Sequence, residues 1–273
     1  MTRREFIGCG LGAAGAATLS GCAGLAGEGR KLKLACQMWS VKDIWQKNGD
    51  ITSVFPQLAD MGYEGVQSKA FWDCDPDKLE KALAASGLKI ADMPVGFPEL
   101  ETETALAKTV AFCKRFDIGF VYIPWFKPKT LDGWKDFVRK LDEYGRRLAP
   151  SGIRIGYHNH LHEFAEPLDG VCPGDVLVNC PTFNFELDVG PVLESGRVPA
   201  VVLGRLAGRV PGLHAKPYPG TFVGATDDRQ DWPAILAAAR AAGTKWIVVE
   251  CEKRKDTFDD VRLSAAYFNR SAL

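Results

Sequence analysis

Three of the four histidines in this 273-residue sequence occupy alternate positions in one short segment, YHNHLHEF at residues 157–164. Alternate side chains share one face of an extended strand, so at least two of the imidazoles of His158, His160 and His162 could converge. Imidazole binds divalent metals and titrates near neutral pH. A lone histidine is more often a hydrogen-bonded core or surface residue, but this clustering predicts a functional site.

Three further residues extend the set, each at the end of a short apolar run: Asp188 in ELDVG, His214 in GLHAK and Glu250 after IVV. With His158 they supply two imidazoles and two carboxylates, a set that suits one Mn²⁺, Co²⁺, Fe²⁺, Zn²⁺ or, less well, Mg²⁺ ion. Either carboxylate alone could equally be a helix cap or a surface residue. Because both follow apolar runs, we expect the four residues to bind one divalent metal ion.

The elements that carry these residues alternate between strands and helices. Short apolar runs predict strands, and 3.6-residue periodicity predicts helices. The predicted strands cover residues 32–38, 65–67, 88–92, 120–123, 153–159, 184–188, 210–214 and 246–250. The predicted helices cover residues 51–61, 77–85, 101–116, 131–148, 199–206, 232–242 and 257–268, with a loop and a turn of helix at 164–181 and a loop at 216–230.

Eight such units over about 250 residues predict an α/β fold of the closed (β/α)₈ TIM barrel type, because parallel strands need crossover helices. An open, doubly wound sheet is the alternative, but no glycine-rich phosphate-binding turn follows the first strand. The sequence shows no internal boundary, so residues 31–273 are expected to form a single domain.

In such a barrel the active site lies at the C-terminal ends of the strands. The residues that end the predicted strands therefore form one ring: Gln37, Trp39, Gln67, Asp92, Tyr122, Trp125, His158, His160, Asp188, His214, Lys216 and Glu250. The expected substrate-binding residues are His160, Asn159, Gln37, Trp39, Gln67 and Trp125. The tryptophans could stack on a sugar ring, although an aromatic residue beside a barrel strand is more often part of the core.

The segments YHNHLHEF, LDVG, GLHAKPY and WIVVE, at the ends of the fifth to eighth strands, resemble the sugar (phosphate) isomerase/epimerase superfamily with the xylose isomerase-like barrel. The resemblance covers the whole predicted barrel, but its specific motifs lie in the second half. It implies a divalent-metal site on His158, Asp188, His214 and Glu250. It also implies an isomerase or epimerase that acts on a small carbohydrate through an enediolate.

One departure from the superfamily pattern affects the expected reaction. The best-understood epimerases have a glutamate as the strand-five ligand, which works with the strand-eight glutamate on the two sides of one carbon; here that position is His158. What remains is a metal that stabilises a developing oxyanion, with Glu250 or a histidine as base. Lys216 is the candidate for the second proton-transferring group, and a solvated lysine is nearly as good an interpretation.

Three other functions compete with the isomerase. Protonation of a leaving group would give a metal-dependent lyase or hydratase, for example of 3-keto-glycosides. A lipoprotein that binds sugar without turning it over is the alternative from another class. A nuclease on the same barrel is disfavoured by the balance of 34 basic and 34 acidic residues and by too few ligands for a multi-metal cluster.

The first residues predict export. Arg3 and Arg4 precede a weakly apolar run at residues 8–20, as in a twin-arginine signal, and LSGC ending at Cys22 resembles a bacterial lipobox. We expect a signal peptide at 1–21, a flexible tether at 22–30, and a location in the cell envelope or periplasm. A transmembrane anchor is the alternative, but the run is short and rich in glycine. Export favours a non-phosphorylated sugar as substrate.

The composition limits the partners. Equal numbers of basic and acidic residues give no field for nucleic acid. We therefore expect a small carbohydrate as partner, no nucleic acid, and membrane contact only through a lipid on Cys22; the sequence also allows an oligomer.

The six later cysteines lack the spacing of a structural zinc site. At most one or two disulfides are expected, with Cys172–Cys180 closing the shortest loop.

Overall fold

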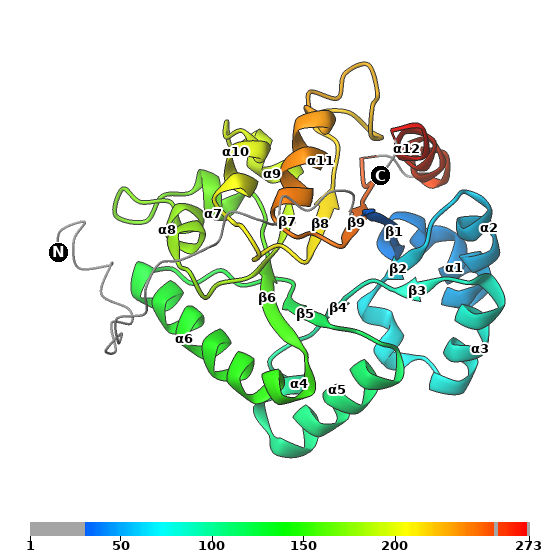
Figure 1. The fold of residues 1–273 in the computed structure, drawn as a ribbon, viewed down its shortest axis with the longest axis horizontal. Helices are drawn as coiled ribbons and strands as arrows, with labels where there is room; N and C mark the ends of the chain where they lie inside the picture. The colour runs from blue at the N-terminus through cyan, green and yellow to red at the C-terminus, as the bar shows by residue number, and fades with distance from the viewer. Residues whose placement is uncertain (1–30, 254–255, 272–273) are drawn as a thin grey trace, which may run out of the picture.

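The strands form one parallel sheet that curls into a nearly closed barrel, with helices around it (Figure 1). The computed structural model describes residues 31–253 and 256–271, so the predicted signal peptide, tether and Cys22 lie outside the described residues. The sheet order is β3-β2-β1-β9-β8-β7-β6-β5-β4. The strands are β1 (Lys33–Gln37), β2 (Gly65–Gln67), β3 (Lys89–Ile90), β4 (Met93–Pro94), β5 (Phe120–Ile123), β6 (Arg154–His158), β7 (Phe185–Asp188), β8 (Gly212–Ala215) and β9 (Trp246–Val249). The predicted single-domain (β/α)₈ barrel is confirmed.

The nine strands correspond to eight barrel positions, because the third position holds two short strands: β3 lies within the predicted strand at residues 88–92, and β4 directly follows that range. β3 pairs with β2, whereas β4 pairs with β5. The backbone N–H of Ala91 still donates to Val66, but that of Val95 donates to Tyr122 on the other side. Between them Asp92 turns its side chain into the barrel, where it is 1% exposed. This segment therefore joins the two edges of the nearly closed sheet.

The helices lie outside the sheet. The α-helices are α1 (Lys42–Asn48), α2 (Phe55–Asp60), α3 (Pro76–Ser86), α4 (Pro98–Glu101), α5 (Glu103–Arg115), α6 (Leu131–Leu148), α7 (His162–Ala165), α8 (Pro173–Asn179), α9 (Val189–Glu194), α10 (Pro199–Gly204), α11 (Trp232–Ala241) and α12 (Phe258–Arg270). The 3₁₀ helices are η2 (Met38–Val41), η3 (Ile51–Val54), η4 (Lys69–Asp73) and η5 (Ala149–Ser151). Helices α1, α4, α7 and α9 were not predicted, because helices of one or two turns give too few residues for a periodic signal.

Within the described ranges, no helix has both the length and the apolar character needed to cross a bilayer. The six described cysteines are all free thiols, so the Cys172–Cys180 bridge is not formed.

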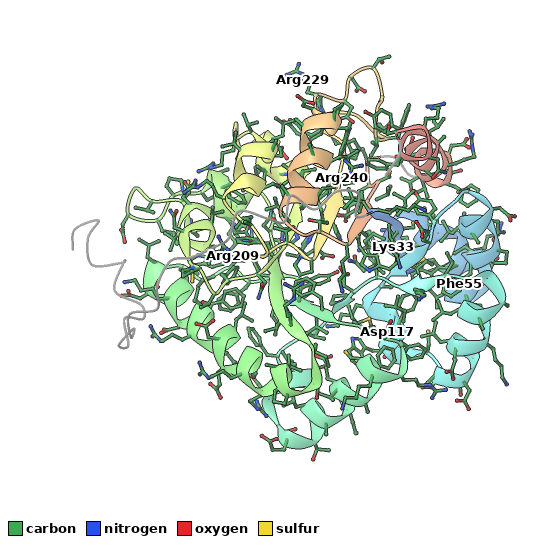
Figure 2. The ribbon with its side chains drawn as sticks, in the orientation of Figure 1. Lys33, Phe55, Asp117, Arg209, Arg229 and Arg240 are labelled. Carbon is green, nitrogen blue, oxygen red and sulfur yellow. The ribbon has the colours of Figure 1, made fainter. Side chains whose placement is uncertain are left out.

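Apolar side chains fill the space between strands and helices, for example around Phe55, which is 1% exposed (Figure 2). On the other side of the barrel Tyr157 packs outward against Trp134 and Phe137 of α6, with ring centroids 5.9 and 5.2 Å away. Successive strand residues face opposite sides. Packing of Tyr157 against α6 therefore turns the next residue, His158, into the barrel.

Gly156 sets how closely β6 approaches its neighbours. A Cβ on this residue would lie 2.6 Å from the carbonyl oxygen of Asn184 and 2.8 Å from the ring of Phe120. Gly156→Ala should therefore lower the free energy of unfolding by about 1–3 kcal/mol, as overpacking does. Urea denaturation measures this change. Gly119→Ala is the matched control, because no atom lies within 4 Å of its Cβ; equal stability of the two variants would contradict the packing argument.

Candidate functional site

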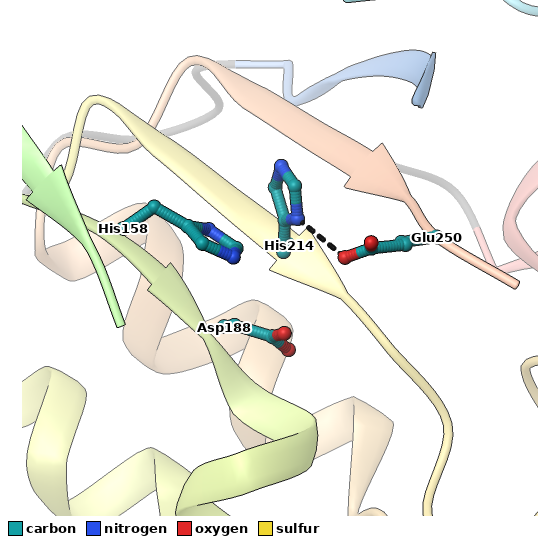
Figure 3. A group of neighbouring side chains, drawn as sticks. All are labelled: His158, Asp188, His214 and Glu250. Carbon is teal, nitrogen blue, oxygen red and sulfur yellow. Dashed lines mark hydrogen bonds and ion pairs between the residues drawn. The ribbon is translucent and has the colours of Figure 1, made fainter. Parts of the chain in front are cut away.

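The four predicted metal ligands converge at the C-terminal end of the barrel (Figure 3). His158 and Asp188 are the last residues of β6 and β7, His214 is the penultimate residue of β8, and Glu250 directly follows β9. These four strands are neighbours in the sheet. Each of the four residues offers a donor atom, and these four atoms all lie within 4.8 Å of one another. Asp188 pairs directly with His214 across β7 and β8, so the strand register itself brings these two side chains together.

The chemistry of these residues fits a divalent cation. All four are buried, with exposures from 1% to 7%. Asp188 Oδ1 accepts a hydrogen bond from Gly190 N (3.0 Å), whereas Asp188 Oδ2 is buried without a hydrogen-bond partner among the described residues. His214 Nδ1 lies 2.8 Å from Glu250 Oε2. Buried carboxylates need compensating positive charge, and two imidazoles with two carboxylates suit a metal of intermediate softness.

Lys216 supplies part of that charge. Its Nζ lies 4.0 Å from Asp188 Oδ2 and 3.8 Å from Glu250 Oε2, and it donates a hydrogen bond to Glu252. Burial lowers the pKa of Lys216, but the carboxylates of Glu250, Asp188 and Glu252 outweigh burial and raise that pKa. Lys216 is therefore an ammonium ion at neutral pH.

Glu250 and His214, which are hydrogen-bonded to each other, have pKa values shifted in opposite directions, each toward its charged form. Burial raises the pKa of Glu250, but the Lys216 ammonium and the hydrogen bond to His214 outweigh it and hold the pKa well below its ordinary value. Burial lowers the pKa of His214, and the carboxylates of Glu186 and Glu250 outweigh it and raise the pKa. A bound cation would take the place of the proton on His214, because a ligand nitrogen must be deprotonated.

Asn159, His160 and His162 of the histidine segment are not among the four converging ligands, and each makes different contacts. Asn159, predicted to bind substrate, is 0% exposed and bonds the backbone of Asp188 in both directions, at 3.1 and 2.9 Å. It therefore fixes the end of β6 to the end of β7. His162 is buried, with Nε2 3.0 Å from the carbonyl oxygen of Phe126. His160 lies beside His158, and burial followed by the charge of His158 lowers the pKa of His160 to about 3, so it is neutral.

Two exposed indoles flank the site. Trp39, which follows β1, is 50% exposed, and Trp125, which follows β5, is 55% exposed. In the sheet order β1 and β5 bound the arc of the four ligand-bearing strands. Trp125 packs against His160 with a centroid separation of 4.5 Å. The side chain of Gln37 accepts a hydrogen bond from the backbone N–H of Trp39, so it holds the segment that carries that indole.

A second polar layer lies within the barrel. Gln67, predicted at the mouth, is 0% exposed and bonds Asp92, Glu186 and His214 inside the barrel. Asp92 and Tyr122, also placed on the predicted ring, are equally buried. The sequence analysis missed Glu186 because it stands inside an apolar strand. Its position two residues before Asp188 was the available signal, since alternation places both on the inner face.

A cavity of about 530 Å³ lies at the opposite, N-terminal end of the barrel. Its lining includes six basic side chains: Lys31, Lys33, Lys89, Lys114, Arg154 and Lys245. None of the four converging ligands lines it. The donor set, rather than the size of a cavity, therefore identifies the candidate site.

Comparisons with known proteins identify the family and the fold of this chain. The family model described as xylose isomerase-like TIM barrel matches residues 55–270. Inosose dehydratase of Clostridium tetani (strain Massachusetts / E88) is 24% identical over 212 residues, which cover 68% of this chain and 70% of the relative. A sugar phosphate isomerase/epimerase from Parabacteroides distasonis ATCC 8503 has a TM-score of 0.70 at 21% identity, covering 89% of this chain and 97% of the other. D-allulose 3-epimerase from Methylomonas sp., solved in complex with D-allulose, has a TM-score of 0.67 at 13% identity, covering 90% and 98%. These structural likenesses show the fold.

Glu163 gives a pH test of how the histidine segment is held. This side chain is 0% exposed, accepts a hydrogen bond from His160 N (2.8 Å), and has its pKa raised from 4.5 to about 7 by burial, against the opposing hydrogen bond from Tyr157. A raised pKa in the folded state means that its contribution to stability is complete below pH 4.5 and is lost as pH rises through about 7.

The free energy of unfolding of the wild type should therefore fall between pH 5 and 8 by up to roughly 3 kcal/mol more than that of Glu163→Gln. Chemical denaturation across this pH range measures the difference. All other titrating groups are common to both proteins, so the substitution is its own control. Parallel pH profiles would contradict the raised pKa.

Proposed function

The chain belongs to the family of xylose isomerase-like TIM barrels, and from that premise we propose that it is a metal-dependent sugar isomerase or epimerase that works through an enediolate. The observation that carries the proposal is the convergence of His158, Asp188, His214 and Glu250 at the C-terminal end of the barrel. Catalytic residues of barrels of this type lie at that end. The structural similarity to sugar epimerases supports a carbohydrate as the substrate class.

One divalent ion, when bound, would supply a Lewis acid for the carbonyl and the adjacent hydroxyl of the sugar. We assign Glu250 as the base that removes the proton beside the carbonyl, because its lowered pKa keeps it ionised at neutral pH. Lys216 is protonated at neutral pH. It therefore donates a hydrogen bond to a substrate oxygen and stabilises developing negative charge, and it does not take a proton from carbon.

His158 limits the reaction to one carboxylate base. The residue ending β6 is an imidazole, so no second carboxylate faces Glu250 from that strand. Transfer of one proton by one base suffices for isomerisation between neighbouring carbons. Epimerisation at a single carbon needs a second group on the opposite face, and His158 or His160 would have to serve.

The position of Lys216 supports a lyase or dehydratase as the second candidate. Its ammonium lies 3.8 Å from the Glu250 carboxylate, so a proton donor stands beside the base. Such a pair can remove a proton from carbon and protonate a leaving hydroxyl or glycosyl oxygen. The relationship to a dehydratase agrees with this alternative.

Exposed Trp39 and Trp125 support a sugar ring as the bound group, because indoles stack on the apolar faces of sugars. We propose a non-phosphorylated sugar or keto-sugar. The support is the export signal predicted from the sequence rather than any group in the site.

We also propose that the chain is exported by the twin-arginine route and anchored by a lipid on Cys22, on the strength of Arg3, Arg4 and the LSGC motif. Cells fed an alkynyl fatty acid should label the wild-type chain but not Cys22→Ala. A wild-type chain without label, or equal labelling of the two, would contradict the anchor.

The reaction is tested by incubating the metal-loaded protein in D₂O with a panel of aldoses, keto-sugars and 3-keto-glycosides. Deuterium should appear at the carbon beside the carbonyl, and Glu250→Gln should slow its incorporation roughly 10²–10⁴-fold, as loss of a general base does. Lys108→Met, on the outer helix α5, is the control and should exchange like the wild type.

The products distinguish the candidates. A rearranged sugar selects the isomerase or epimerase, whereas a new double bond or a released aglycone selects the lyase. No exchange with any substrate and any of the five metals would contradict both and favour a sugar-binding lipoprotein.

A further inference from the structure

Beneath the four converging ligands, three polar side chains fill the barrel interior. Gln67, Asp92 and Glu186 are each 1% exposed or less and come from β2, the break between β3 and β4, and β7. Gly212 makes room for them, since a Cβ there would lie 2.4 Å from Asp92 Oδ2. A buried polar layer of this kind is costly unless its hydrogen bonds are made.

The amide of Gln67 has only one orientation that satisfies its neighbours. Its Nε2 donates to Asp92 Oδ1 and to Glu186 Oε1. Burial raises the pKa of Glu186, but the charges of His214 and His158 outweigh burial and lower that pKa, so the carboxylate is ionised and only accepts hydrogen bonds. An amide nitrogen has two hydrogens to give. A reversed amide would place its oxygen against Glu186. Gln67 Oε1 consequently faces the opposite way, toward His214 Nε2, at 2.9 Å.

This orientation decides which nitrogen of His214 carries the hydrogen. His214 Nε2 faces two acceptors, Gln67 Oε1 at 2.9 Å and Glu186 Oε1 at 3.3 Å, so it must be the N–H. A neutral imidazole carries one N–H and one lone pair. In the absence of a cation, Nδ1 also faces an acceptor, the Glu250 carboxylate at 2.8 Å, and carries the second proton of His214. A cation at the centre of the cluster displaces that proton, so the lone pair then lies on Nδ1. A metal ligand needs that lone pair.

We propose that Gln67 is a positioning residue for the metal: held by Asp92 and Glu186, it fixes His214 as the Nε2–H tautomer and directs the Nδ1 lone pair to the cation. The inference rests on the proposed metal site and assigns Gln67 a role below it, in place of the predicted contact with substrate. Glu186 Oε2 also lies 3.4 Å from His158 Nδ1, and neither atom has a hydrogen-bond partner among the described residues; this charge contact leaves His158 Nε2 for the cation. Outer partners of this kind orient metal-binding histidines in general.

The test replaces the acceptor while keeping the volume. In Gln67→Met, the Zn²⁺ affinity should fall roughly 10–100-fold, the usual cost of losing an outer partner. Competition titration with a chelating dye measures it. Gln230→Met is the matched control: Gln230 is also buried, but its amide donates to the carbonyl oxygens of Val189 and Lys216 and does not contact His214. Its Zn²⁺ affinity should equal that of the wild type.

The tautomer is read directly by long-range ¹H–¹⁵N correlation NMR of the Zn²⁺-loaded chain, in which only four histidines contribute signals. The wild type should show His214 protonated at Nε2 and coordinated through Nδ1. Coordination through Nε2 in the wild type would overturn the inference even if Gln67→Met failed to fold. Unchanged affinity and tautomer in folded Gln67→Met would also overturn it while leaving the metal site intact. A wild type without any Zn²⁺-shifted histidine would instead remove the metal site of the proposed function.

Discussion

The site depends on balancing the negative charge of three carboxylates that are buried inside the barrel. Glu186, Asp188 and Glu250 are exposed by 6% or less, and ionised groups at such positions need cations or hydrogen-bond donors within reach. His158, His214 and Lys216 stand among them at 2.8–4.0 Å. A divalent ion at the centre would complete this balance.

The barrel provides that arrangement through strand register and alternation. The four ligand-bearing strands are consecutive in the sheet, so one inward residue from each reaches a common space. Tyr157 packs outward on α6 and sends His158 inward, while Asn159 fixes the ends of β6 and β7 to each other. Structure-forming residues thus alternate with chemically active ones along the same segment. The layer containing Gln67 then orients the ligands from below.

Sequence reasoning recovered the fold and brought the four ligands to one place because it needed only periodicity and the rule that parallel strand ends meet. It placed α6 at its observed bounds, since eighteen residues give a strong helical signal. It put Gln67 and Asp92 at the mouth because the depth of a residue in a barrel depends on the stagger between strands, which one sequence does not reveal. Glu186 was not predicted as a site residue, because the role of a charged residue within an apolar strand depends on its partners, which lie on other strands. The presence of two short strands at the third barrel position is likewise a matter of pairing, which local sequence does not encode.

Anomalous diffraction from crystals of the Co²⁺-loaded protein tests the central claim most directly, because it locates the ion without assuming its ligands. The account predicts one peak at the C-terminal end of the barrel, about 2.0–2.3 Å from one donor atom of each of His158, Asp188, His214 and Glu250. Absence of a peak there from Co²⁺-saturated crystals, or a single peak bound by other residues, would contradict it.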